Sequence, residues 1–134
     1  MSAAELRTDG VIVACAVSAG IHAALAPDHF RETTAAGIGF VAASVVLGVL
    51  AVVLTLRPGE RAFLAAALVF AGLIGSYVLA VTTGIPVVHP DVDPVEGLAL
   101  ATKAIEAAAL ALTVSACGPL RASLSLTQPK GRLT

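Results

Sequence analysis

The chain has 134 residues, of which 57% are hydrophobic and 13% charged, and its mean hydropathy is +0.94. This composition lies far to the apolar side of soluble domains and favours an integral membrane protein. The net charge is −1 at pH 7 and no run of basic residues interrupts the chain, which disfavours nucleic acid as a partner.

Four apolar runs follow one another, each close to the length of about 20 residues that crosses a membrane as a helix. The predicted helices cover approximately residues 10–26, 35–56, 62–81 and 94–117. Proline, glycine and charged residues between them mark loops, the first of which is expected at residues 27–34. The sequence therefore predicts an all-α integral membrane bundle of four transmembrane helices, residues 1–120, and a short polar tail, residues 121–134.

Lysine and arginine are distributed unequally between the two ends of this predicted bundle. The end with the first and third loops has Arg31. The end with both termini and the second loop has Arg7, Arg57, Arg61, Arg121, Lys130 and Arg132. Because positive loops resist translocation, we expect a multi-pass protein of the cell membrane with both termini in the cytoplasm. The alternative, a signal peptide cleaved after Ala26, is disfavoured because Pro27 would follow the cut.

Histidines and carboxylates gather at the opposite end, which is expected to be extracytoplasmic. Imidazole and carboxylate groups suit zinc, copper(II) or non-haem iron. The sequence therefore predicts a site for a divalent transition metal, with the candidate ligands His22, His29, Glu32, His89 and Glu96. The alternative is that the loop residues are solvated or cap a helix. His22 is the strongest candidate, because an ionisable side chain within an apolar helix usually meets a partner or a cavity. Its own alternative is a hydrogen bond to a backbone carbonyl.

The predicted fourth helix carries two charges deep in the membrane, Lys103 and Glu106. At a spacing of i, i+3 they can pair, and their charge should turn them toward the interior of the bundle. One interpretation is a proton path, in which the pair exchanges a proton for a cation. The other is a structural ion pair that fixes the register of the helix. Tyr77, near the end of the third predicted helix, is a weaker candidate as a hydrogen-bond donor to the same site.

The segment from His22 to Glu32 reads H-x-x-L-x-P-[DE]-H-x-x-E. Together with Thr82-Thr-Gly-Ile-Pro86 and the acid-bearing fourth helix, it resembles small uncharacterised four-helix membrane proteins of actinobacteria. The likeness covers most of the chain. It implies the same four-helix fold and groups His22, His29 and Glu32 with the loop before the fourth helix, but it implies no activity.

Motifs for nucleotide binding, serine hydrolysis and zinc proteolysis do not occur in the sequence, so an enzyme is disfavoured. The leading hypothesis is a protein of the lipid bilayer that binds, senses or hands over a divalent transition metal. A second hypothesis is a small proton-coupled transporter, a homo-oligomer that uses Lys103 and Glu106. A third is an accessory subunit of a larger membrane complex, in which the small residues serve helix packing.

Overall fold

The computed structural model describes residues 1–86, 88 and 91–125, and side chains in the last helix up to residue 116. The helices it contains are α1 (Ala3–Glu32), α2 (Thr34–Leu56), α3 (Glu60–Thr82) and α4 (Gly97–Ser125). Each is long and apolar enough to cross a membrane, α4 over its first 20 residues. The predicted all-α bundle of four membrane-spanning helices is thus confirmed, and the chain is a multi-pass membrane protein.

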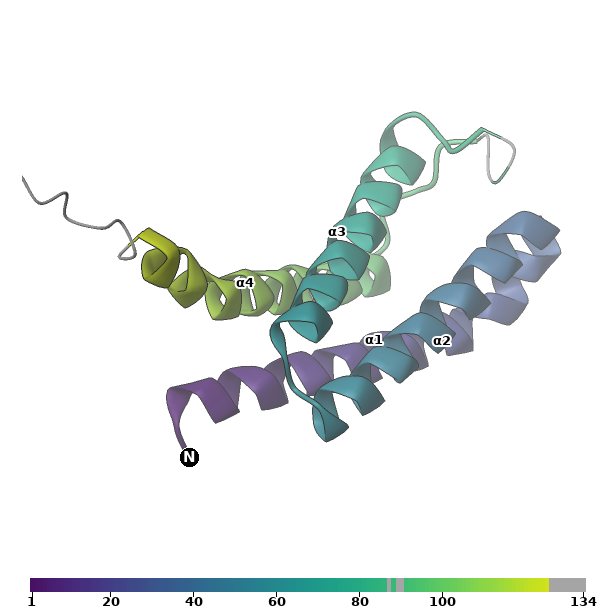
Figure 1. The fold of residues 1–134 in the computed structure, drawn as a ribbon. Helices are drawn as coiled ribbons and strands as arrows, with labels where there is room; N and C mark the ends of the chain where they lie inside the picture. The colour runs from purple at the N-terminus through teal and green to yellow at the C-terminus, as the bar shows by residue number, and fades with distance from the viewer. Residues whose placement is uncertain (87, 89–90, 126–134) are drawn as a thin grey trace, which may run out of the picture.

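The four helices form two hairpins. In Figure 1, α1 and α2 lie side by side along their length, and α3 leads through a longer connection into α4. The hairpins meet mainly where α1 crosses α4, while α2 and α3 diverge from the short turn that joins them. The N-terminus and the C-terminal end of α4 lie at the same end of the molecule (Figure 1). The two hairpins are therefore separated most at the opposite end.

The apolar core fills the half of the bundle nearer to the termini. Its fully buried members include Val11, Leu47, Leu54 and Phe70, one or more from each of the first three helices. Many large apolar side chains on the outside of the bundle are exposed, as expected for surfaces that face lipid. Most buried polar residues, Ser18 and His22 of α1 and Thr102 and Glu106 of α4, by contrast lie toward the end away from the termini, where the hairpins begin to separate. The molecule therefore has a packed half and a more open, polar half.

Helix α1 is longer than predicted at both ends. It begins at Ala3 because Ser2 and Glu5 form a capping box, in which each side chain accepts a hydrogen bond from the backbone of the other. It continues through Pro27 to Glu32, so the prediction of a loop at residues 27–34 was wrong. A proline removes one backbone donor from a helix, and here the following turn is still closed by the hydrogen bond from Thr33 to the His29 carbonyl.

Close packing against α2 also holds this last turn of α1 in place. A Cβ atom at Gly37 of α2 would overlap the ring of Phe30 of α1, so the glycine allows the ring to lie against the α2 backbone. Thr33 joins the two helices, because its hydroxyl accepts a hydrogen bond from the Ala36 amide. Together these contacts keep His29 and Glu32 on a helix.

Replacement of Gly37 by alanine is therefore expected to destabilise the chain. Relative to Gly48→Ala, where an added Cβ meets nothing within 4 Å, the loss should be about 1–3 kcal/mol, the usual cost of overpacking. Both substitutions gain the same helix propensity, so the difference isolates the contact with Phe30. Titration with sodium dodecyl sulfate, followed by circular dichroism, measures it. Equal stability of the two variants would show that the ring moves aside without cost.

The predicted limits of the fourth helix need a similar correction. The helix begins at Gly97 rather than at residue 94, and its first backbone hydrogen bond runs from Leu100 to the Glu96 carbonyl. It extends to Ser125 and includes Pro119, so the first residues of the predicted tail, 121–125, are helical. Here too a single proline does not end a helix. Residues 126–134 of the predicted tail lie outside the described residues.

Candidate functional site

A cavity of about 550 Å³ lies between the two hairpins in their more open half. All four helices line it, as does the connection between α3 and α4. Most of its wall is apolar, formed by Ile21, Leu25, Phe40, Leu73, Ile85 and Leu98. The mouth is crossed by a link between the hairpins, because the Thr33 hydroxyl donates to the Val88 carbonyl at 2.6 Å. The volume of the cavity lies within the range of pockets that hold small organic molecules.

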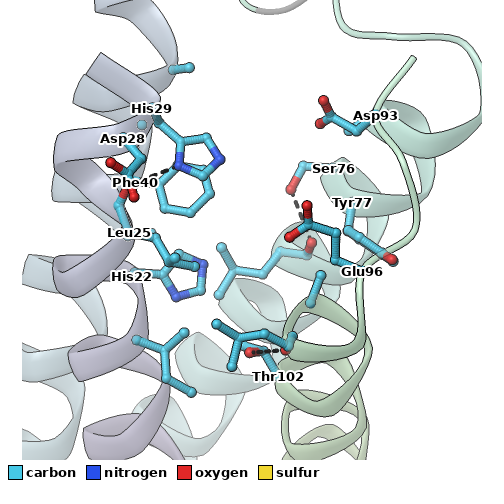
Figure 2. A pocket seen from close by; sticks show the side chains of 18 of the residues that line it. His22, Leu25, Asp28, His29, Phe40, Ser76, Tyr77, Asp93, Glu96 and Thr102 are labelled. Carbon is cyan, nitrogen blue, oxygen red and sulfur yellow. Dashed lines mark hydrogen bonds between the residues drawn. The ribbon is translucent and has the colours of Figure 1, made fainter. Parts of the chain in front are cut away.

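Two histidines of α1 stand on one wall of this cavity. The Nδ1 atom of His22 is 2.8 Å from the Ser18 carbonyl, and that of His29 is 3.0 Å from the Leu25 carbonyl. Because a carbonyl oxygen accepts but does not donate, each Nδ1 must carry the proton. Figure 2 shows the other ring nitrogen, Nε2, turned toward the cavity in both residues. In its neutral form each histidine therefore offers the cavity a hydrogen-bond acceptor.

An aromatic ring of α2 holds the two imidazoles in position. The Phe40 ring stacks on His29 with 3.6 Å between ring centroids and lies 5.3 Å from the His22 ring in a tilted arrangement. His22 is buried, while His29 is partly exposed nearer to the mouth. The alternatives considered for His22, a bond to a backbone carbonyl and a place at a cavity, are thus both realised.

Carboxylates stand around the mouth. Asp28 of α1 is neutralised by the guanidinium of Arg31 at 2.7 Å, in an exposed pair. On the opposite wall, Figure 2 shows the Glu96 carboxylate turned toward the histidines. Within the described part of the chain it makes no ion pair. Glu32 and Asp93 also line the cavity, and each has an interaction partner. Glu96 is therefore the carboxylate best placed to meet a ligand.

A buried ionic network forms the floor of the cavity. The ammonium of Lys103 donates to Oε2 of Glu106 at 2.6 Å, so the predicted pair is present. The hydroxyl of Ser18 on α1 donates to Oε1 of the same carboxylate at 2.7 Å and so joins the hairpins. Glu106 is fully buried, whereas the Lys103 side chain is 17% exposed and lines the cavity. The lysine thus stands between the cavity and the buried carboxylate.

Tyr77 contributes its ring rather than its hydroxyl. The Lys103 ammonium lies over the ring, 5.8 Å from its centroid, within the range of a cation–π contact. The hydroxyl is buried, has no hydrogen-bond partner in the described structure, and points away from the histidines in Figure 2. The expectation that Tyr77 donates a hydrogen bond to the site is therefore not met. Its ring is instead part of the surroundings of the Lys103 cation.

The predicted metal ligands are brought together in part. His22, His29, Glu32 and Glu96 all line the one cavity, whereas His89 lies outside the described residues. Among residues 1–86, 88 and 91–116, however, no three histidine, cysteine, aspartate or glutamate side chains are close enough to hold a metal ion together. The structure thus gathers four of the five residues around a space larger than a coordination sphere.

Two residues of this site were missed by sequence reasoning. Ser18 carries the hydrogen bond between α1 and Glu106, and its signal was a polar residue one turn before His22 within an apolar helix. Phe40 stacks on His29, but nothing in the sequence of α2 distinguishes it from an apolar residue that faces lipid.

Comparisons with known proteins add no relative to this picture. No family model matches the chain, and no curated protein or solved structure matches it.

Proposed function

We propose that the chain is a membrane protein that binds a small organic cation, a protonated amine on an apolar body, in the cavity between its hairpins. The observation that carries this proposal is the kind of polar group that the cavity leaves available. Nε2 of His22, Nε2 of His29 and the Glu96 carboxylate are hydrogen-bond acceptors in a mainly apolar space. An ammonium group donates to such acceptors, and an apolar body fits the walls.

The charges around the cavity support a cation rather than an anion. The positive charge of Lys103 is already paired with Glu106, and that of Arg31 with Asp28. Glu96, without an ion pair in the described structure, leaves a negative charge at the mouth. Glu96 is exposed, so its charge can draw cations toward the mouth, while the apolar walls suit the body of the ligand.

Titration calorimetry of the full chain in lipid nanodiscs tests the proposal. The probe is 2-naphthylmethylammonium, and its uncharged match is 2-naphthylmethanol, which has the same ring system. We expect the ammonium to bind at least about tenfold more tightly, because a charge-assisted hydrogen bond contributes roughly 1.5–3 kcal/mol. Equal affinity of the two compounds, or no binding of either beyond that of empty nanodiscs, would contradict the proposal.

Glu96→Gln removes the charge at the mouth and keeps its shape. We expect it to weaken binding of the ammonium about tenfold, equivalent to about 1.4 kcal/mol, and to leave binding of the alcohol unchanged. The matched control is Glu60→Gln. Glu60 is exposed at the first residue of α3 and does not line the cavity, so this variant should change neither affinity. An equal loss in both variants would assign the effect to the overall charge of the protein.

A transition metal ion is a second candidate ligand, favoured by one observation. In both histidines Nδ1 is held by a backbone carbonyl and Nε2 is left free, which is the arrangement common in histidines that bind zinc, copper or iron. Glu32 or Glu96 would complete such a site if the hairpins moved closer together. Metal content by mass spectrometry tests it, beside a His22→Ala/His29→Ala variant. Near-stoichiometric metal that is lost in the variant would favour the metal over the organic cation.

The side from which the ligand enters follows from the proposed orientation. The unequal distribution of lysine and arginine supports cytoplasmic termini in the cell membrane, so the cavity would open to the extracytoplasmic side. A reporter that is active only in the periplasm, or only in the cytoplasm, can be fused to the C-terminus. A periplasmic C-terminus would reverse the orientation and leave the proposed ligand unchanged.

A further inference from the structure

The floor of the cavity already holds a cation, the ammonium of Lys103. It contacts the Glu106 carboxylate at 2.6 Å and the face of the Tyr77 ring at 5.8 Å. A carboxylate and an aromatic face are also groups that bind an organic ammonium in an apolar site. The lysine side chain lines the cavity and so reaches these groups from the ligand's side. Lys103 therefore occupies a site that suits the ligand proposed above.

Near this floor, the positive charge of Lys103 balances the negative charge of Glu106. On α1, Ser18 contacts Glu106 and also His22. Lys103 lies on α4, the same helix as Glu106, and Tyr77 faces it from α3. Helix α2 has no titratable residue in its sequence. His22 donates from Nδ1 to the Ser18 carbonyl and turns Nε2 toward the cavity. A ligand cation at the floor would thus share one buried carboxylate with the Lys103 ammonium, and two cations so close together repel each other strongly where screening is weak.

We propose that Lys103 releases its proton when an organic cation reaches the floor of the cavity, so that the chain exchanges one proton for one cation. The N–H bond of the Lys103 ammonium breaks, its electron pair stays on Nζ, and the proton passes to water in the cavity. The ligand ammonium then pairs with the Glu106 carboxylate and the Tyr77 ring. One positive charge enters and one leaves, so the net charge of the bundle does not change. Lysine suits this role because a desolvated ammonium can lose its proton, whereas a guanidinium does not.

This inference rests on the proposed function and deepens it from binding to proton-coupled exchange. Proton release also distinguishes two positions that the bound cation could occupy, the mouth and the floor of the cavity. A cation held only at the mouth, by Glu96 and His29, leaves the Lys103–Glu106 pair intact and releases no proton. A cation at the floor displaces the pair.

Calorimetry in buffers of different ionisation enthalpy counts the protons. Titrations of the full chain in nanodiscs with 2-naphthylmethylammonium, at pH 7 in phosphate, HEPES and Tris, should show release of about one proton per bound cation. The affinity should accordingly rise about tenfold for each unit of pH increase between pH 6 and 8. Binding with no proton release, and with an affinity independent of pH, would overturn the inference and leave the proposed function standing. No binding at all would overturn both.

Lys103→Arg identifies the source of the proton. Arginine keeps the positive charge and the partner Glu106, but it holds its protons at any pH used here. We expect the variant to release no proton on binding and to bind the cation at least about tenfold more weakly, with helix content unchanged by circular dichroism. If the variant released as many protons as the wild type, the proton would come from the ligand or another residue, and the inference would be wrong.

Discussion

Replacing Lys103 by methionine is expected to lower the free energy of unfolding by about 3–5 kcal/mol, the usual cost of leaving a buried charge without its partner. Glu106 is fully buried, and without Lys103 its carboxylate would keep one described hydrogen bond, that from Ser18. Methionine fills a volume similar to that of the lysine stem, so the loss reports the charge rather than a cavity. Titration with sodium dodecyl sulfate, followed by circular dichroism, measures the effect.

Two further variants make this prediction specific. Glu106→Leu should cost less than Lys103→Met, because the Lys103 side chain reaches the cavity and can be solvated there. The double variant should recover most of the stability, since an apolar pair of similar size often replaces a buried ion pair without loss. If the two single losses simply added in the double variant, the pair would have no energetic coupling, and the central role given to it would be wrong.

Filling the cavity is expected to abolish binding of the ligand. Ala99 of α4 lines the cavity between the mouth and the floor, one turn before Lys103. In Ala99→Phe the added ring would occupy the space proposed for the apolar body of the ligand. We expect the affinity for 2-naphthylmethylammonium to fall by roughly a hundredfold, equivalent to about 2.7 kcal/mol, as measured by titration calorimetry in nanodiscs.

The matched control is Ala101→Phe. Ala101 lies two residues farther along the same helix, is exposed, and does not line the cavity. The same added ring should there face lipid and leave the affinity unchanged. If both variants bound the probe like the wild type, the ligand would bind elsewhere. If both lost binding equally, the effect would come from helix packing rather than from the cavity.

The parts of this structure that could be predicted from sequence are those set by local chemistry. Four apolar runs near spanning length gave the four helices, because a membrane leaves such segments few other structures. The spacing of Lys103 and Glu106 gave their ion pair, since i, i+3 residues share one face of a helix. A single histidine in the apolar first helix correctly indicated a cavity or a partner at His22.

The parts that sequence reasoning missed depend on contacts between distant segments. Pro27 was expected to end α1, but the helix continues because Thr33 and Phe30 are held by α2. The hydrogen bond from Ser18 to Glu106 depends on how α1 crosses α4, which no local pattern encodes. The volume of the cavity likewise depends on how far apart the hairpins lie. Because the described histidines and carboxylates are spread around this space and not gathered as a metal site, the proposed ligand is an organic cation and not the predicted metal ion.

The most direct test of the proposed binding site is the position of a bound ligand. A crystal structure of the full chain with 6-bromo-2-naphthylmethylammonium would locate the bromine by its anomalous scattering. We predict a peak between the hairpins, against the wall formed by Phe40 and Leu73. A bromine peak on the lipid-facing surface, or at the end of the bundle near the termini, would contradict the proposed site.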